Sequence, residues 1–136
     1  MTHGRRQDWH ANLIQYLSEV SRRPFAEGQN DCALFLAGGV RAMTGVDYAT
    51  LYRGRYTTIR GGLRILRKDG FNDHVELAKH HLKSKPVAVA NAGDGAVIAT
   101  DEGQALGIVQ GAAVYVLRPA GLGLVPLTDA ILALEV

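Results

Sequence analysis

Hydrophobic positions recur at two different spacings along this chain, and the change between them divides it into two parts. In the first part, apolar residues fall three or four positions apart in four successive segments, the spacing of one helix face. Each segment opens with a residue that can accept the free N–H groups of a first helical turn: Asp8, Asn30 or Asp31, Thr57 or Thr58, and Asn72 or Asp73. The pattern predicts helices over about 8–22, 32–43, 59–68 and 73–82.

The second helix carries Gly38 and Gly39 in its interior, where each glycine costs about 1 kcal/mol relative to alanine. We therefore expect another backbone to pack closely against this helix. In the third helix, Ile59, Leu63 and Leu66 are expected to face inward.

After residue 93 the apolar runs become short and are separated by glycine turns, the pattern of β-strands joined by hairpins. We expect strands over about 96–100, 105–109, 112–117 and 124–125, a linker beginning at 83–86, and either a last strand or a turn of helix over 128–136. Helices followed by an antiparallel meander predict an α+β fold in which the helix carrying Cys32 covers the sheet. One domain over 1–136 is expected, loose over 1–8, mainly helical over 9–85 and mainly β over 93–136.

Composition supports a packed globular domain, because 47% of the 136 residues are hydrophobic and 21% are charged. A net charge of +2 is too small to indicate nucleic-acid binding. No apolar run approaches the roughly 18 residues that span a bilayer, and the first residues lack a signal-peptide core. We expect neither membrane insertion nor secretion by a leader of its own. A single cysteine excludes an intrachain disulfide and is compatible with a reducing cytoplasm.

Cys32 is the candidate for chemistry. It follows the residues that can begin the second helix, where free N–H groups and the helix dipole favour a thiolate. The alternative is an inert core thiol, because the apolar residues after Cys32 raise the pKa of a thiol that they bury. The sequence leaves both interpretations open.

Two further groups of residues are candidates for binding. His74, His80 and His81 share the fourth helix, but their spacing does not suit a zinc pair. We expect no metal and no cofactor, and we place these histidines on the surface, with a role as substitute base for Cys32 left open. The loop over 46–58 interleaves aromatic residues, arginines and glycine, which is typical of contact surfaces and also of solvated loops. Its candidate partner-binding residues are Tyr52, Arg53, Arg55 and Tyr56.

The third helix has a basic face formed by Arg60, Arg64, Arg67 and Lys68. Such a face can meet an acidic partner, although most charge stripes on helices are simply the solvated side.

Three motifs together resemble the NlpC-type cysteine peptidases of the papain-like class, which cut peptide bonds in bacterial cell walls. These are Asp31-Cys32 opening an apolar helix, the run from Gly93 to Ile98, and the run from Ala105 to Gly111. The peptidases have Asp-Cys-Ser-Gly, then Gly-Asp, then His-Val-Gly-Ile at the corresponding places. The resemblance makes Cys32 the candidate nucleophile, with Asp31 and Asp94 as candidate polar partners. It places Ala105, which cannot accept a proton, where the peptidases have their base histidine.

The whole chain also resembles a small family found among tail genes of bacteriophages and gene transfer agents. This likeness is carried by Trp9, Pro24-Phe25, the residues 28–34, 43–45, 53–56 and 93–94, Ala105 to Gly107, and the stretch 122–127. It implies a structural or assembly protein of the tail tip or hub that binds other tail proteins, located in the bacterial host cytoplasm during assembly and then in the virion tail. The alternatives are an active hydrolase of cell-wall peptides using Cys32 and, further removed, an independent cytoplasmic binding module.

Overall fold

The computed structural model describes residues 4–136, and within them four helices precede six strands, which confirms the predicted α+β order. The helices are α1 (Trp9–Arg22), α2 (Cys32–Thr44), α3 (Ile59–Lys68) and α4 (His74–His81). The strands are β1 (Lys83–Lys85), β2 (Gly95–Thr100), β3 (Gly103–Val109), β4 (Ala113–Arg118), β5 (Gly121–Pro126) and β6 (Ala130–Glu135). Two short 3-10 helices, η1 (Val87–Val89) and η2 (Leu127–Asp129), join strands.

The residues that begin the helices are Asp31, Thr58 and Asp73. Each of their side chains accepts the backbone N–H of the third residue of its helix. Asp8 stands at the start of α1 but makes no such bond, and its carboxylate lies 3.3 Å from Arg6 instead. Polar side chains thus fix three of the four helix starts.

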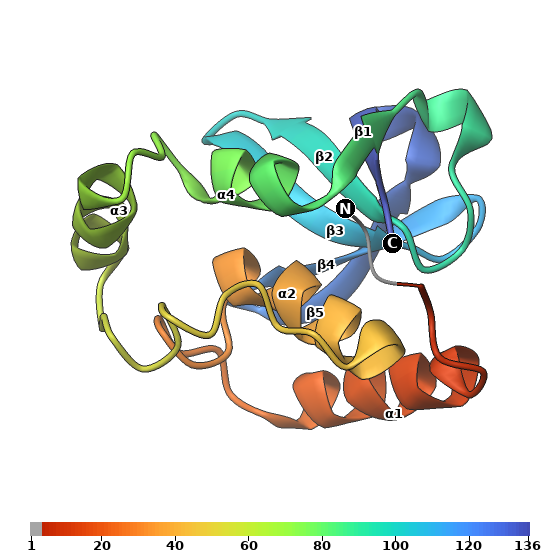
Figure 1. Ribbon diagram of the computed structural model, residues 1–136, viewed down its shortest axis with the longest axis horizontal. Helices are drawn as coiled ribbons and strands as arrows, with labels where there is room; N and C mark the ends of the chain where they lie inside the picture. The colour runs from red at the N-terminus through yellow and green to blue at the C-terminus, as the bar shows by residue number, and fades with distance from the viewer. Residues whose placement is uncertain (1–3) are drawn as a thin grey trace.

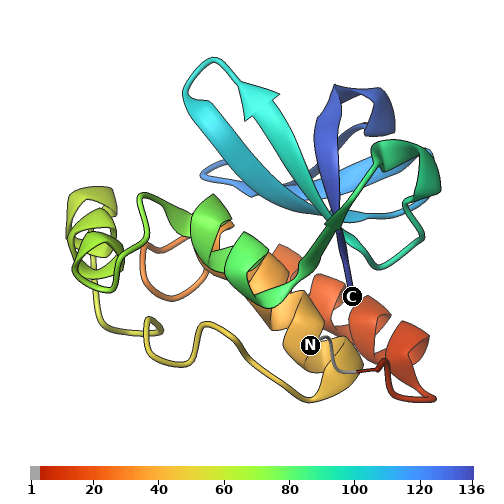
Figure 2. The ribbon, with the colours of Figure 1, turned by 45° about the horizontal axis from the view of Figure 1, so that its top comes forward.

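The strands form one antiparallel sheet in the order β1-β6-β2-β3-β4-β5. Strands β2 to β5 follow one another as the predicted meander, and the last segment returns as β6 to pair with the free side of β2. The expected linker at 83–86 is wrong, because residues 83–85 pair with β6 as an edge strand. The sheet lies on the helical layer and curls away from it (Figure 1, Figure 2).

The two faces of the sheet enclose different cores. Val97, Leu106 and Ile108 face the helices and join a cluster with α1, α2 and α4. Ile98 and Val114 belong to a second cluster inside the curl of the sheet. Because side chains alternate between faces along a strand, this division assigns each residue of β2 and β3 to one side.

Helix α2 is the centre of the helical layer. Leu36 and Ala37 are fully buried, and the helix packs against both α1 and the sheet. A Cβ at Gly38 would collide with the ring of Tyr16 in α1, and one at Gly39 would meet Ile108 of β3. The expectation of a close backbone was wrong in this detail, since large side chains occupy the space that the glycines leave.

Helix α3 lies at the edge of the molecule, between the loop that follows α2 and helix α4 (Figure 1). Leu66 is buried as expected and Leu63 is half-buried. Ile59 was expected to face inward but is 67% exposed, because α3 packs through Gly62 and Leu66. A partly apolar face of α3 is therefore open to solvent.

Candidate functional site

The turn before α2 is built around the Asp31 carboxylate, which is only 1% exposed. It accepts hydrogen bonds from the N–H of Gly28 at 2.7 Å, the N–H of Leu34 at 2.9 Å and the hydroxyl of Tyr56 at 2.6 Å. Gly28 has a φ of 82°, and a Cβ there would collide with the carbonyl of Tyr56. Glycine and aspartate at these two positions therefore hold the chain in the shape that begins the helix.

Cys32 follows as the first residue of α2, and its side chain is partly buried. Burial raises the pKa of the Cys32 thiol to about 11, and the negative charges of Asp31 and Glu27 act in the same direction. Backbone hydrogen bonds at the helix start favour the thiolate but are outweighed. The thiol is therefore protonated at neutral pH, and the advantage that a helix start gives to a thiolate is cancelled.

The Asp31 charge affects its other neighbours in the same way. The pKa of Glu27 is raised by partial burial and by the adjacent Asp31 carboxylate. The pKa of Tyr56 is raised by burial and by its hydrogen bond to Asp31. None of the ion pairs found within residues 4–136 includes Asp31, so neutral donors alone hold this carboxylate.

Cys32 lines a pocket of about 250 Å³ between the helices and the β2–β3 hairpin. Helices α2, α3 and α4, the loop before α3 and the hairpin all contribute walls. Its lining includes Cys32, Tyr56, Leu63, His74, Gln104 and Ala105. The sequence motifs around Cys32 and Ala105 thus line one pocket.

The alternation of side chains along β3 shows which of its residues points toward the helices, where a base for Cys32 would have to lie. Ala105 pairs with Ile98, whose side chain lies in the cluster inside the curl of the sheet. Its neighbour Leu106 faces the helices. Alternation therefore places the Ala105 side chain on the face away from α2 and the Gln104 side chain on the face toward it. Of the two β3 residues that line the Cys32 pocket, Gln104 is therefore the one whose side chain lies on the helix side of the sheet, and its amide cannot act as a general base.

His74 was expected at the surface, and the structure corrects this. It is the first residue of α4, it lines the Cys32 pocket, and its Nε2 atom is buried without a hydrogen-bond partner. Burial lowers the pKa of His74, so the imidazole is neutral near pH 7. The signal was present in the sequence, because His74 precedes the buried Leu77 and Ala78 by three and four positions. His80 and His81 are exposed, as expected.

Asp94 is not part of this pocket. Its carboxylate accepts from Arg5 Nη2 at 3.0 Å and Lys85 Nζ at 2.7 Å, and from the backbone N–H groups of Asn91 and Val136. It precedes β2, whereas the far end of that strand reaches the Cys32 pocket. With a rise of about 3.3 Å per residue, the strand places Asp94 about 20 Å from that end.

The contacts of Asp94 also change the prediction that residues 1–8 are loose. Residues 1–3 lie outside the described part of the chain, but Arg5 bonds Asp94 and also the carbonyls of Ala92 and Val136. Asp94 thus joins both ends of the described chain to the sheet.

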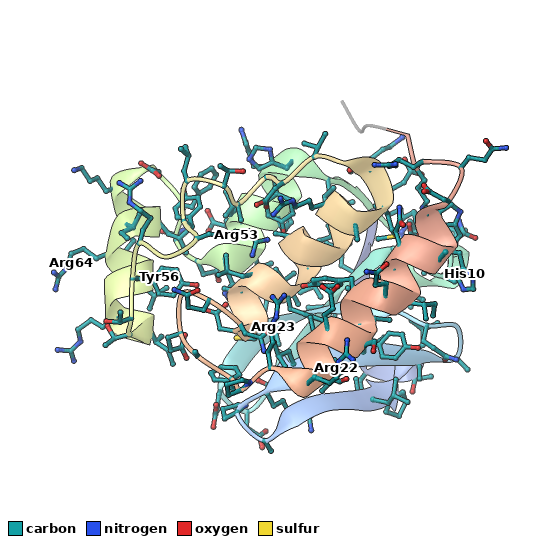
Figure 3. All side chains as sticks on the ribbon, turned by 90° about the horizontal axis from the view of Figure 1, so that it is seen from below. His10, Arg22, Arg23, Arg53, Tyr56 and Arg64 are labelled. Carbon is teal, nitrogen blue, oxygen red and sulfur yellow. The ribbon has the colours of Figure 1, made fainter. Side chains whose placement is uncertain are left out.

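Three of the four residues predicted to bind a partner instead hold the loop after α2 in place. Tyr52 is 5% exposed and donates to Asp69 at 2.7 Å, and Arg53 pairs with Asp47 at 2.6 Å. Tyr56 donates to Asp31, and Figure 3 shows both Tyr56 and Arg53 within the loop between α2 and α3. Only Arg55 among the four is exposed. The aromatic and arginine pattern therefore marked internal contacts that cover the start of α2.

Within residues 4–136, no cluster of three or more His, Cys, Asp or Glu side chains is arranged to hold a metal ion. No helix in the same region has the length and apolar character needed to cross a membrane.

A protein-family model matches residues 4–136, and its description is "Domain of unknown function (DUF6950)". The matched range includes all four helices and the whole sheet. No curated protein and no solved structure matches the chain.

Proposed function

The chain belongs to the DUF6950 family, and we propose that it is a non-catalytic docking protein of a bacteriophage or gene transfer agent tail, acting at the tail tip or hub. In this proposal it keeps the framework of an NlpC-type cysteine peptidase and uses it to bind other tail proteins. It assembles in the bacterial host cytoplasm and then resides in the virion tail.

One observation carries the non-catalytic part of the proposal. The Cys32 thiol is partly buried beside the carboxylates of Asp31 and Glu27, and burial together with these charges raises its pKa to about 11. A cysteine nucleophile needs a lowered pKa or an adjacent base, and the β3 residues that line the pocket are Gln104 and Ala105, neither of which is a base. The environment therefore favours the form of the thiol that does not attack a peptide bond.

The framework supports the other part of the proposal. A cysteine at the start of a buried helix packed on an antiparallel sheet is the arrangement that the resemblance implies. A domain can retain its packing after losing one catalytic side chain, because core burial and hydrogen bonding do not depend on that residue. A retained framework without a base is suited to binding.

Co-expression with the products of neighbouring tail genes tests the proposal. We expect the chain to elute with at least one of them on size-exclusion chromatography, and the Cys32→Ser variant to elute with it equally well. Elution of the wild-type chain alone from every such mixture would overturn the docking function.

A second candidate function is an active hydrolase of cell-wall peptides, and the position of His74 favours it. This imidazole is neutral and lines the same pocket as Cys32, although its Nε2 atom makes no hydrogen bond to the thiol. Turnover of purified peptidoglycan or of a D-glutamyl-diaminopimelate peptide would establish the hydrolase, provided that Cys32→Ser and His74→Gln both abolish it. We expect no turnover by any of the three proteins.

A further inference from the structure

Helix α3 has two adjacent faces, one that lines the Cys32 pocket and one that carries its cations. Ile59, Leu63 and Leu66 line the Cys32 pocket. The three arginines of this helix each follow one of these residues by one position, so they occupy the stripe next to the pocket. These cations and the adjoining lysine are all exposed: Arg60, Arg64, Arg67 and Lys68.

The α3 cations are not used in ion pairs within the described chain, and in this they resemble Arg22 of α1. Arg5 and Arg53 are paired with carboxylates, whereas none of the ion pairs found within residues 4–136 includes a cation of α3. Figure 3 shows Arg64 extending outward from α3 at the edge of the molecule, far from Arg22 at the end of α1. The charge on this helix is therefore available to an outside partner.

The walls of the pocket other than α3 carry negative charges. Glu27, from the turn before α2, and Glu102, from the β2–β3 hairpin, both line the pocket. A ligand bound across the pocket thus meets cations beside α3 and carboxylates at the other walls. This arrangement of charges favours one orientation of a bound peptide that has an acidic end.

We infer that this pocket receives one apolar side chain of a partner protein segment, whose acidic residues lie over α3 and whose other flank is neutral or basic. The inference rests on the proposed docking function and names the site and the chemistry of the partner. A pocket of about 250 Å³ with a largely apolar lining accommodates a large side chain, which accounts for the exposed Ile59 at its edge.

A protein segment fits these observations better than a nucleic acid. The carboxylates of Glu27 and Glu102 repel phosphates at the pocket rim. A nucleic-acid site would need cations on both sides of the groove, together with aromatic side chains exposed for stacking on the bases. The two tyrosines of the pocket, Tyr52 and Tyr56, instead make internal hydrogen bonds.

Fluorescence polarisation with defined probes tests the inference. The probe is a fluorescein-labelled peptide in which a run of glutamates precedes a single tryptophan. The matched probes carry lysines in place of the glutamates or alanine in place of the tryptophan, and a labelled DNA duplex serves as the nucleic-acid probe. We expect saturable binding of the first peptide, and at least about tenfold weaker binding of the others.

Two changes to the protein locate the site. The double variant Arg60→Glu and Arg64→Glu should weaken binding of the first peptide at least about tenfold. The matched control, Arg22→Glu with Arg118→Glu, makes the same change in net charge at exposed cations outside α3 and should bind within about twofold of wild type. Circular dichroism confirms that both variants are folded.

Alkylation of Cys32 gives an independent measure of pocket occupancy, because it is the only thiol in the chain. Saturating glutamate–tryptophan peptide should slow the reaction of Cys32 with N-ethylmaleimide several-fold, and protein alkylated beforehand should lose peptide binding. The Cys32→Ser variant, treated in the same way, should retain it.

The results separate this inference from the docking function on which it rests. Equal binding of the acidic and basic peptides, preference for the DNA duplex, or unchanged binding after alkylation would overturn the inference. The same double variant and alkylated protein are then mixed with any tail protein that binds the wild type. Undiminished binding there overturns the pocket assignment while leaving the docking function intact, whereas no binding by the wild type overturns the docking function itself.

Discussion

The structure contains two buried aspartates, each only 1% exposed and each at a turn that leads into a central element. Asp94 precedes strand β2 and is held by two cations, Arg5 and Lys85, together with backbone N–H groups. Asp31 precedes helix α2 and is held by two backbone N–H groups and the Tyr56 hydroxyl. One carboxylate has its charge compensated and the other does not.

This difference gives Asp94 a structural role and gives Asp31 an electrostatic effect on its neighbours. The charge of Asp94 is balanced by Arg5 and Lys85, and its contacts join the N-terminal segment, β1 and the C-terminus. The charge of Asp31 is satisfied as a hydrogen-bond acceptor, but it still opposes any further negative charge nearby. Cys32, Glu27 and Tyr56 all have raised pKa values, with Asp31 among the causes for each. A peptidase needs the opposite condition around its nucleophile.

The largest expected effect is at Asp94. The Asp94→Asn substitution leaves two mostly buried cations without their main counter-charge, and breaking a buried ion pair from one side costs about 3–5 kcal/mol. We expect a loss of this size in the free energy of unfolding, measured by urea denaturation. A loss below about 1 kcal/mol would show that Asp94 does not join the chain ends as described.

The matched substitution Asp31→Asn should cost less, about 2 kcal/mol. Asparagine still caps α2 through its amide oxygen, but its NH₂ group replaces the acceptor that now faces Gly28 and Tyr56. Urea denaturation under the same conditions gives the comparison. A loss equal to that of Asp94→Asn would mean that charge compensation does not distinguish the two sites.

Tyr56→Phe should have the smallest effect on stability, about 1 kcal/mol, because Asp31 keeps its two backbone donors. Thermal unfolding followed by circular dichroism measures the change. The control is Tyr52→Phe, which removes a hydroxyl bonded to Asp69 instead and leaves Asp31 untouched. If only Tyr56→Phe speeds alkylation of Cys32, the hydroxyl also restricts access to the thiol.

Much of the fold could be predicted from the sequence, because local patterns determine it. Helical spacing and the capping side chains Asp31, Thr58 and Asp73 located the helix starts, and short apolar runs between glycines located β2 to β4. Strand β1 was missed because three residues rich in lysine carry no apolar alternation. They form a strand only because β6 offers an edge to pair with.

The site was predicted less completely, since it depends on contacts between distant segments. The motifs placed Cys32 and Ala105 in one pocket, but the direction of the β3 side chains depends on sheet pairing. The burial of His74 and the internal bonds of Tyr52, Arg53 and Tyr56 likewise arise from tertiary packing. Composition and spacing cannot distinguish an arginine that forms an ion pair within the chain from one that is exposed and free to bind another protein.

The central claim is that burial and an uncompensated Asp31 charge keep the Cys32 thiol protonated. The direct test is the rate of Cys32 alkylation by iodoacetamide as a function of pH, measured by mass spectrometry on folded wild-type protein and on Asp31→Asn. Because the pKa is raised, the rate should stay low through pH 9 and rise with a midpoint near 11, and Asp31→Asn should move that midpoint downward. A wild-type midpoint below about 8, near or under the ordinary value for a cysteine, would contradict the account and favour the hydrolase.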